Sequence, residues 1–186
     1  MYYLHTYPNT KLRFYAGDMQ LHIESDAAYL VIPGARSWAA GHFYLSAAST
    51  PNKTYKGRFN APIHTECHTI KNVVSSAAEA ECAALFHNCS VAVGIRHALN
   101  GLGNLQQRTE VITDNSTANS FVHSEMRVKQ SNSWDMQYNW LRDCFAQQQF
   151  KIRWDKGIYN LADYFTKHHS PNHHRTKRYD YILKGF

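Results

Sequence analysis

The sequence is poor in cysteine and has no long apolar run. Its four cysteines, at positions 67, 82, 89 and 144, include no Cys-x-x-Cys pair, and two of them fall inside a helical pattern. We therefore expect free thiols and an intracellular protein rather than a disulfide-rich secreted one. No apolar stretch approaches the roughly 18 residues of a membrane span, and the first residues lack the apolar region of a signal peptide. A membrane protein is not expected.

Internal repeats and low-complexity segments are also missing, which favours one domain, with or without tails. A chain of 186 residues is long enough to bury a core and fold without disulfides. The formal net charge is +6, with twelve histidines in addition, and the basic residues are scattered until a cluster at 175–178. This balance suits a polyanionic partner. The cluster either holds phosphates or is ordinary surface charge.

Alternation and helical periodicity predict a mixed α/β fold. Three strands come first, separated by a turn at Pro33-Gly34 and by a polar loop, which implies an antiparallel meander. Helical crossovers imply that the later strands pair in parallel, giving a five-stranded mixed sheet. The predicted strands are 20–26, 42–46, 63–70, 108–114 and 150–154, and the predicted helices are 76–99, 116–123, one capped by Ser133 and one capped by Asn160.

The long helix predicted from Ser76 begins with two glutamates that have different roles. Ser76 and Glu79 have the Ser-x-x-Glu spacing of a capping box, in which both side chains accept hydrogen bonds from backbone N–H groups. Glu81 lies roughly opposite Glu79, on the apolar stripe. A carboxylate facing the core must be paired, protonated or bound to a metal. Glu81 is therefore a functional residue, the partner of a buried arginine, or a residue at the rim of the core.

Three further acids lie where predicted strands and helices meet. Asp26 ends the first strand, Asp114 ends the fourth, and Asp163 is at the third position of the last helix. Because ligands gather at the carboxyl ends of strands in such sheets, we expect these acids and Glu81 to converge. Two hard divalent ions would neutralise them and hold a phosphodiester. Taken singly, Asp114 could cap the next helix, and Asp163 could complement a helix dipole.

Several segments together resemble the ribonuclease H domain of copia-type LTR-retrotransposon polyproteins. The resemblance covers nearly the whole chain from about residue 21 to residue 167, and the combination of segments is more specific than any one of them. The segments are Ser25-Asp26-Ala27, Arg36-Ser37 with Gly41 before an aromatic strand, Ser75-Ser76-Ala77-Ala78-Glu79-Ala80-Glu81, Asp114-Asn115-Ser116-Thr117-Ala118 and Asn160-Leu161-Ala162-Asp163-Tyr164-Phe165-Thr166-Lys167.

The resemblance implies an RNase H-like fold and an endonuclease that cuts the RNA strand of RNA/DNA hybrids during reverse transcription. It places the family's Asp-Glu-Asp-Asp set on Asp26, Glu81, Asp114 and Asp163, which would hold two Mg²⁺ ions, with Mn²⁺ as an alternative. The reverse transcriptase domain of the same polyprotein is the implied partner. We expect the isolated domain to be a monomer, located in the cytoplasm within a retrotransposon particle, or in the nucleus.

Two groups of residues are expected to bind the hybrid. Contacts with 2′-hydroxyl groups across the minor groove would come from residues beside the acids, and contacts with phosphates from basic residues. The first group is Ala27, Asn115, Ser116 and Thr117, and the second is Arg36, Arg127 and Lys129.

A departure from the family pattern concerns release of the product. Many relatives have a histidine between the last strand and the last helix that helps the product leave. Here that loop reads Asp155-Lys156-Gly157-Ile158-Tyr159. Lys156, or His168 and His169 at the far end of the last helix, are the hypothetical substitutes.

We expect an N-terminal arm or connection remnant over 1–18, the RNase H-like domain over 19–168, and a basic, His-rich tail over 169–186. A zinc site in the tail is disfavoured because no cysteine pair is near and Pro171 breaks the helical spacing. Two other functions stay open: a non-catalytic nucleic-acid-binding or tethering domain of a decayed element, and an integrase-like DNA strand-transfer core. The four intact acids argue against the first. The order of the acids argues against the second, because integrase-like cores have three acids with the glutamate near the C-terminal end.

Overall fold

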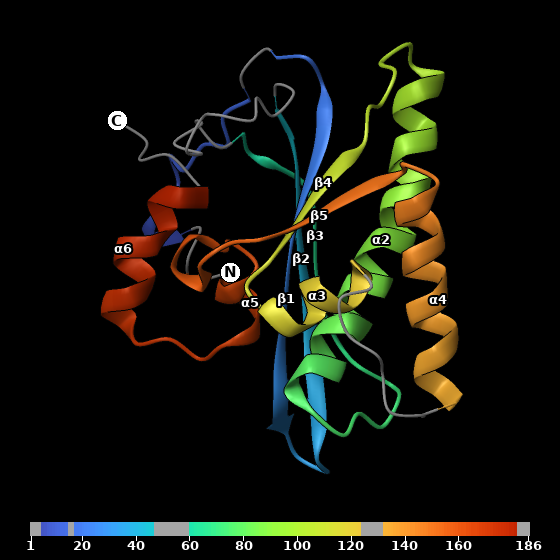
Figure 1. Ribbon diagram of the computed structural model, residues 1–186. Coiled ribbons are helices and arrows are strands. Elements are labelled where there is room, and N and C mark those ends of the chain that lie inside the picture. The colour runs from blue at the N-terminus through green and yellow to red at the C-terminus, as the bar shows by residue number, and fades with distance from the viewer. Residues whose placement is uncertain (1–4, 15–16, 47–59, 124–131, 182–186) are drawn as a thin grey trace.

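The computed structural model describes residues 5–14, 17–46, 60–123 and 132–181. Its centre is a five-stranded sheet with the strand order β3-β2-β1-β4-β5 (Figure 1). The first three strands pair antiparallel, β4 pairs with β1 in parallel, and β5 pairs with β4 in parallel. The predicted mixed sheet is thus confirmed. The strands are β1 (Gln20–Ile32), β2 (Arg36–Ser46), β3 (Pro62–Thr69), β4 (Thr109–Thr113) and β5 (Phe150–Trp154).

The first strand is longer than predicted, because it does not end at Asp26. β1 pairs with β2 in an unbroken register as far as Ala28, and pairing resumes at Ile32 after an irregularity. The predicted turn at Pro33-Gly34 is confirmed, with Gly34 at a φ of +82°, which glycine adopts without steric strain. Asp26 therefore lies inside a central strand and not at its end.

Helices cover both faces of the sheet. In Figure 1, α2 (Ala77–Gly101), α3 (Ser116–Val122) and α4 (Asn132–Ala146) lie on one side of it. The 3₁₀ turn η1 (Gly157–Tyr159), α5 (Asp163–Thr166) and α6 (Pro171–Tyr181) follow β5, and α5 and α6 lie on the other side. No helix within the described ranges is both long and apolar enough to cross a bilayer.

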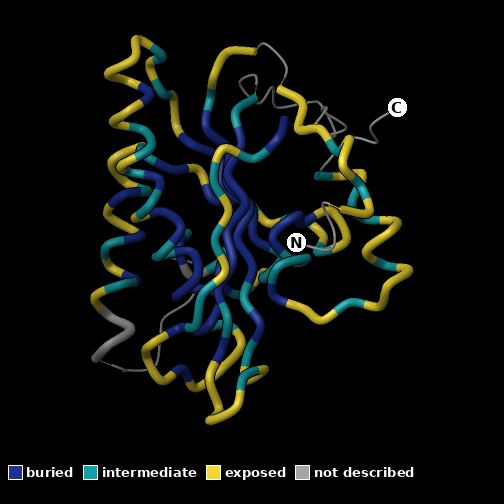
Figure 2. Tube along the Cα trace, turned by 180° about the vertical axis from the view of Figure 1, so that it is seen from behind, coloured by how far each residue is buried: buried dark blue, intermediate teal, exposed yellow. Residues whose placement is uncertain are grey.

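The main core lies between the sheet and α2 with α4, and Figure 2 shows the strands as the buried centre of the molecule. The stripe predicted for α2 is confirmed, since Leu85, Ala92 and Leu99 are buried. Tyr138 and Leu141 of α4 pack into the same cluster, as their spacing on one helix face requires. The orientation of α2, and with it of Glu81, is thus fixed by apolar packing.

The C-terminal part of the chain differs from the prediction. Asn160 does not cap the last helix; it ends η1, and α5 has only four residues. The predicted solvated tail contains the helix α6, whose Tyr181 hydroxyl donates a hydrogen bond to the Leu161 carbonyl oxygen at 2.6 Å. The Arg178 guanidinium lies 4.2 Å from the centre of the Tyr7 ring, so α6 also contacts the N-terminal arm. The division into arm, domain and tail stays a prediction.

Candidate active site

Three aspartates from distant parts of the sequence meet beside the central strands. Asp26 comes from β1, Asp114 follows β4, and Asp163 is the first residue of α5. One carboxylate oxygen of each lies within 4.8 Å of the others. β1 and β4 are neighbours and parallel, which brings Asp114 next to Asp26. Three negative groups at this separation form a site suited to a cation.

Glu81 supplies a fourth carboxylate from the first turns of α2. Its Oε1 accepts a hydrogen bond from the Ala27 backbone N–H at 3.3 Å, so the side chain reaches the residue next to Asp26. Its Oε2 is buried without a hydrogen-bond partner among the described residues. No arginine in those residues pairs with Glu81. A carboxylate oxygen without a partner beside three aspartates fits a cation-binding site better than a structural ion pair.

Glu79 and Ser76 form the helix cap, with one difference from the prediction. The Ser76 hydroxyl accepts a hydrogen bond from the Glu79 N–H at 3.2 Å. The Glu79 carboxylate accepts from the backbone N–H and the hydroxyl of Ser75, at 2.5 and 2.6 Å, and not from the N–H of Ser76. Glu79 is also buried, because it folds back onto this turn. The two glutamates thus have separate tasks.

Burial and mutual repulsion keep protons on the cluster. Burial, together with Asp114 and Asp163, raises the pKa of Asp26 to about 7, although Thr166 opposes the shift. The pKa of Glu81 is raised well above its usual value by burial and then by the charges of Asp26 and Asp114. Burial also raises the pKa of Asp114. These carboxyl groups become fully ionised at neutral pH only when a cation compensates them.

Among the described residues, Lys167 supplies a positive charge to the cluster. Its ammonium group pairs with the carboxylate of Asp163, and its charge opposes the raised pKa values of Asp26, Glu81 and Asp114. Burial acts to lower the pKa of Lys167, but the Asp163 hydrogen bond and the nearby acids raise it. One ammonium group compensates only one of the four carboxylates.

The segment that carries Asp163 is tied to β1 by buried hydrogen bonds. Asn160 Nδ2 donates to the Ser25 carbonyl oxygen at 2.9 Å, and its Oδ1 accepts from the Ala162 N–H at 3.0 Å. Glu24 Oε2 accepts from the Leu161 N–H. These bonds fix α5 against the strand that carries Asp26, which places Asp163 in the cluster.

Two residues that sequence reasoning missed support this arrangement. Glu24, which the alternation of β1 puts on the same side as Asp26, is 2% exposed, and its pKa is raised to about 7, chiefly by burial. Asn88 Nδ2 donates to Ser25 Oγ and to the Ala40 carbonyl oxygen, both at 2.9 Å. Gly41 lies inside β2, which begins at Arg36 and not at His42 as predicted, and a Cβ there would overlap the Asn88 side chain, which accounts for the glycine. A polar residue on the apolar stripe of α2 was the available signal for Asn88.

Asp114 does not cap the following helix, so that alternative is wrong. Asn115 has this role, because its Oδ1 accepts a hydrogen bond from the Ala118 N–H at 2.9 Å. Trp154 Nε1 donates to the Asp114 carbonyl oxygen at 2.8 Å, which fixes the backbone. Gly157 lies so close that a Cβ there would overlap Asp114 Oδ2. The Asp114 carboxylate is held toward the cluster and is not used by α3.

The other residues predicted for the site are partly placed by the structure. Ala27 is half-buried beside Glu81, and Asn115, Ser116 and Thr117 begin α3 next to Asp114. Arg36 is exposed at the start of β2. Arg127 and Lys129 lie outside the described residues.

The three residues predicted to aid product release lie in different surroundings. Lys156 is exposed and precedes Gly157, which contacts Asp114. The His168 ring is 5.9 Å from that of Trp38. His169 stacks on Tyr164 with ring centres 5.1 Å apart. Lys156 and His168 each adjoin a residue next to the acidic cluster, Gly157 beside Asp114 and Lys167 paired with Asp163.

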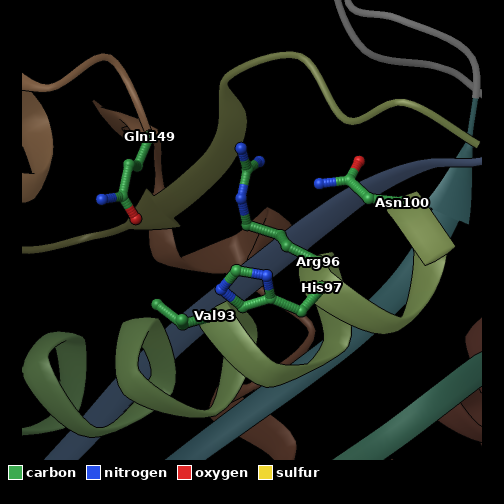
Figure 3. Close-up of a pocket in the computed structure, with 5 residues that line it drawn as sticks. All are labelled: Val93, Arg96, His97, Asn100 and Gln149. Carbon is green, nitrogen blue, oxygen red and sulfur yellow. The ribbon is translucent and has the colours of Figure 1, made fainter.

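A shallow depression elsewhere on the protein is not the candidate site. It is lined by Val93, Arg96, His97, Asn100 and Gln149, near the C-terminal end of α2 (Figure 3). At 1.5 Å per residue, Val93 lies about 18 Å along the helix from Glu81. Arg96 there is engaged by the Gln107 carbonyl oxygen at 2.6 Å and Thr109 Oγ1 at 2.5 Å. Arg96 thereby connects α2 with the start of β4.

The four carboxylates fit a hard divalent cation. All the donors are oxygens, Glu81 Oε2 has no partner among the described residues, and burial together with neighbouring carboxylates raises the pKa values of Asp26, Glu81 and Asp114. Mg²⁺ and Mn²⁺ prefer such ligands.

Comparison with known proteins supports the fold. No family model and no curated protein matches the sequence. Among solved structures, the N-terminal RNase H domain of a Mycobacterium tuberculosis protein aligns with a TM-score of 0.53 and 15% identity, covering 80% of this chain and 91% of that one. LC11 RNase H1 in complex with an RNA/DNA hybrid aligns with a TM-score of 0.55 and 14% identity, covering 78% of this chain and 92% of that one. RNase H1 of Halobacterium salinarum aligns with a TM-score of 0.51 and 15% identity, covering 78% of this chain and 93% of that one. The chain has an RNase H-like fold.

Proposed function

We propose that this protein is a ribonuclease H, an endonuclease that hydrolyses the RNA strand of RNA/DNA hybrids. The observation that carries the proposal is the meeting of Asp26, Asp114 and Asp163 with Glu81, whose buried Oε2 has no partner among the described residues. The RNase H-like fold supports it, and one structure with that fold was solved with an RNA/DNA hybrid.

Asp26, Glu81, Asp114 and Asp163 would hold two divalent ions, Mg²⁺ or Mn²⁺. Bound there, the ions would activate water and stabilise charge on the departing 3′ oxygen, leaving a 3′ hydroxyl and a 5′ phosphate. The protein's own contribution is to hold the carboxylates in place before substrate arrives. Asn160 anchors the α5 segment to β1, and the Thr166 hydroxyl orients Asp26 by donating to its Oδ2. Such preorganisation avoids rearrangement during the reaction.

Recognition of the hybrid would come from residues around the cluster. Ala27, which donates a hydrogen bond to Glu81, and Asn115 to Thr117, which follow Asp114 in the chain, are proposed to contact 2′-hydroxyl groups. Arg36, with Arg127 and Lys129, would hold phosphates. Lys156, His168 and His169 are proposed for product release, because Lys156 precedes Gly157 beside Asp114 and the two histidines follow Lys167, which pairs with Asp163.

The motif resemblance supports a more specific origin, the Pol polyprotein of a copia-type retrotransposon. The proposed partner is then the reverse transcriptase domain of the same polyprotein, and the isolated domain would be a monomer. The proposed location is the retrotransposon particle in the cytoplasm, or the nucleus.

The test is cleavage of an end-labelled RNA strand, presented alone, in an RNA/DNA hybrid and in an RNA duplex, with Mg²⁺ or with EDTA. We expect the wild type to cut only the hybrid and only with Mg²⁺. Asp114→Asn, which keeps the shape of the side chain but removes its charge, should lower the rate by at least about 100-fold. Asp143→Asn, on the exposed side of α4, is the matched control and should cut normally.

Two results would contradict the proposal. Equal cleavage by wild type and Asp114→Asn would mean that the nuclease activity lies elsewhere or comes from a contaminant. Binding of the hybrid without cleavage by the wild type would favour a tethering domain.

A further inference from the structure

A second group of possible metal ligands lies on the edge strand, away from the acidic cluster. The segment His64-Thr65-Glu66-Cys67-His68 belongs to β3, where alternate side chains point to the same face. His64, Glu66 and His68 therefore share one face, and His87 approaches them from α2. Glu66, His68 and His87 each offer one ligand atom within 4.8 Å of the others.

The contacts are centred on the Glu66 carboxylate. Its Oε2 lies 2.5 Å from His87 Nε2, and its Oε1 lies 2.9 Å from His64 Nε2. His68 Nδ1 is 4.0 Å from Oε2, which is too far for a hydrogen bond. The rings of His68 and His87 have their centres only 3.9 Å apart. One carboxylate does not supply a hydrogen-bond partner for all three imidazoles, whereas a shared cation would serve the two close rings and the carboxylate together.

The surroundings leave the group open to an ion. The side chains of His68 and His87 are 36% and 39% exposed, and that of Glu66 is 21% exposed. Cys67 is not part of the group, because it points to the other face and its thiol donates to the Phe165 carbonyl oxygen at 3.1 Å. The available donors are thus imidazole nitrogens and a carboxylate oxygen.

This donor set differs in chemistry from that of the acidic cluster. Two imidazoles with one carboxylate are a common ligand set of Zn²⁺, and imidazole also suits the neighbouring transition metals Co²⁺, Ni²⁺ and Cu²⁺. Mg²⁺ prefers oxygen ligands alone. His64, bound to the second oxygen of Glu66, is placed to orient the carboxylate as an outer partner.

We propose that Glu66, His68 and His87 form a second metal site, which binds one Zn²⁺ or a similar transition-metal ion and is oriented by His64. The ion would connect β3, the edge of the sheet, with α2 at a point six residues after Glu81. Its role would be to stabilise the position of α2 relative to the edge strand.

The test is titration of the metal-free protein with Zn²⁺ by calorimetry, in excess Mg²⁺. We expect one Zn²⁺ to bind per chain at micromolar protein concentration. Zn²⁺ at a hundredfold excess over Kd should raise Tm by about 5 to 10 °C. Co²⁺ should give visible absorption bands typical of histidine ligation.

Variants separate this site from other histidines. His87→Ala should lower the Zn²⁺ affinity by more than about 100-fold, and His64→Ala by about 10- to 100-fold. His97→Ala is the matched control, since His97 is an exposed histidine of the same helix. A double change, His173→Ala with His174→Ala, controls for the histidines of α6. Both controls should bind Zn²⁺ as the wild type does.

The proposal is overturned if the wild type does not bind Zn²⁺, or if His87→Ala binds it with unchanged affinity. Glu66→Gln provides a second variant with nearly unchanged shape, in case His87→Ala does not fold, as judged by circular dichroism without metal. Because the readout is metal binding and not RNA cleavage, the outcome is independent of the nuclease proposal.

Discussion

The acidic cluster and the histidine group both contact α2, but their electrostatics are opposite. In the acidic cluster, four carboxylates face one ammonium group of the described part of the chain, and burial with mutual repulsion raises the pKa values of Asp26 and Glu81. In the histidine group, burial also acts to raise the pKa of Glu66, but hydrogen bonds from His64 and His87 outweigh it, and the pKa is lowered. The first cluster is unstable in its ionised form without a cation. In the second, hydrogen bonds from His64 and His87 stabilise the ionised carboxylate of Glu66.

Burial explains why the two groups respond differently to their surroundings. Asp26 is 2% and Glu81 6% exposed, and buried hydrogen bonds to β1 hold the neighbouring segment. The histidine group lies on an edge strand in partial contact with solvent. Solvent screens charge poorly at the buried acidic cluster and well at the partly exposed histidine group. Changes at the acidic cluster should therefore have the larger effects on stability.

The largest expected difference between the two groups is in how the stability of the metal-free protein depends on pH. The folded-state pKa of Asp26, about 7, lies above its usual value, so folding favours the protonated form. Its contribution to stability is present below about pH 4 and is lost as the pH rises through about 7. Asp26→Asn should therefore stabilise the protein in EDTA at pH 8 by about 4 kcal/mol and have little effect at pH 4. Urea unfolding at both pH values measures this.

Glu66→Gln is the contrasting variant for that experiment. The pKa of Glu66 is lowered, so its ionised form contributes stability above its usual pKa and loses it as the pH falls through the folded-state value. We expect Glu66→Gln to be slightly destabilising at pH 8, opposite in sign to Asp26→Asn. If both variants changed the free energy of unfolding at pH 8 in the same direction, the two groups would not have the opposite electrostatics described above.

A change that leaves all charges in place should affect only the acidic cluster. Asn160→Ala removes the hydrogen bond to the buried Ser25 carbonyl oxygen and should cost about 2 kcal/mol of unfolding free energy. Hybrid cleavage should fall at least about tenfold, because Asp163 is no longer held. Zn²⁺ affinity should not change. Asn172→Ala, at an exposed position of α6, is the control for stability.

Unfolding curves and cleavage rates would be measured on the same samples. Normal cleavage by folded Asn160→Ala would show that the tie to β1 does not position Asp163.

The smallest expected effect comes from one added methyl group. In Gly157→Ala, the new Cβ would overlap Asp114 Oδ2, and the carboxylate must rotate away. Stability should change by less than about 1 kcal/mol, because the end of a side chain moves easily, while hybrid cleavage should fall about tenfold. Gly94→Ala, which meets no atom within 4 Å, is the control. Steady-state cleavage and thermal unfolding distinguish the two effects, and unchanged cleavage by Gly157→Ala would mean that Asp114 tolerates displacement.

Much of the fold was predictable from local patterns. The five strands, the capped helix α2 and the core-facing direction of Glu81 follow from alternation, the Ser-x-x-Glu spacing and the helical period. The errors lie where long-range contacts overrode local signals. β1 continues past Asp26 because β2 pairs with it, and Asn160 turns toward Ser25 and does not cap a helix.

The sequence by itself determined which residues carry charge, which helix face is apolar and which strands alternate, because these depend on neighbours within a few positions. Only the tertiary structure decided that Glu24 and Asn160 tie α5 to β1, and that His87 joins the alternating ligands of β3. These contacts connect residues 21 to 137 positions apart. Their formation depends on how the helices pack on the sheet, and no local period encodes that packing.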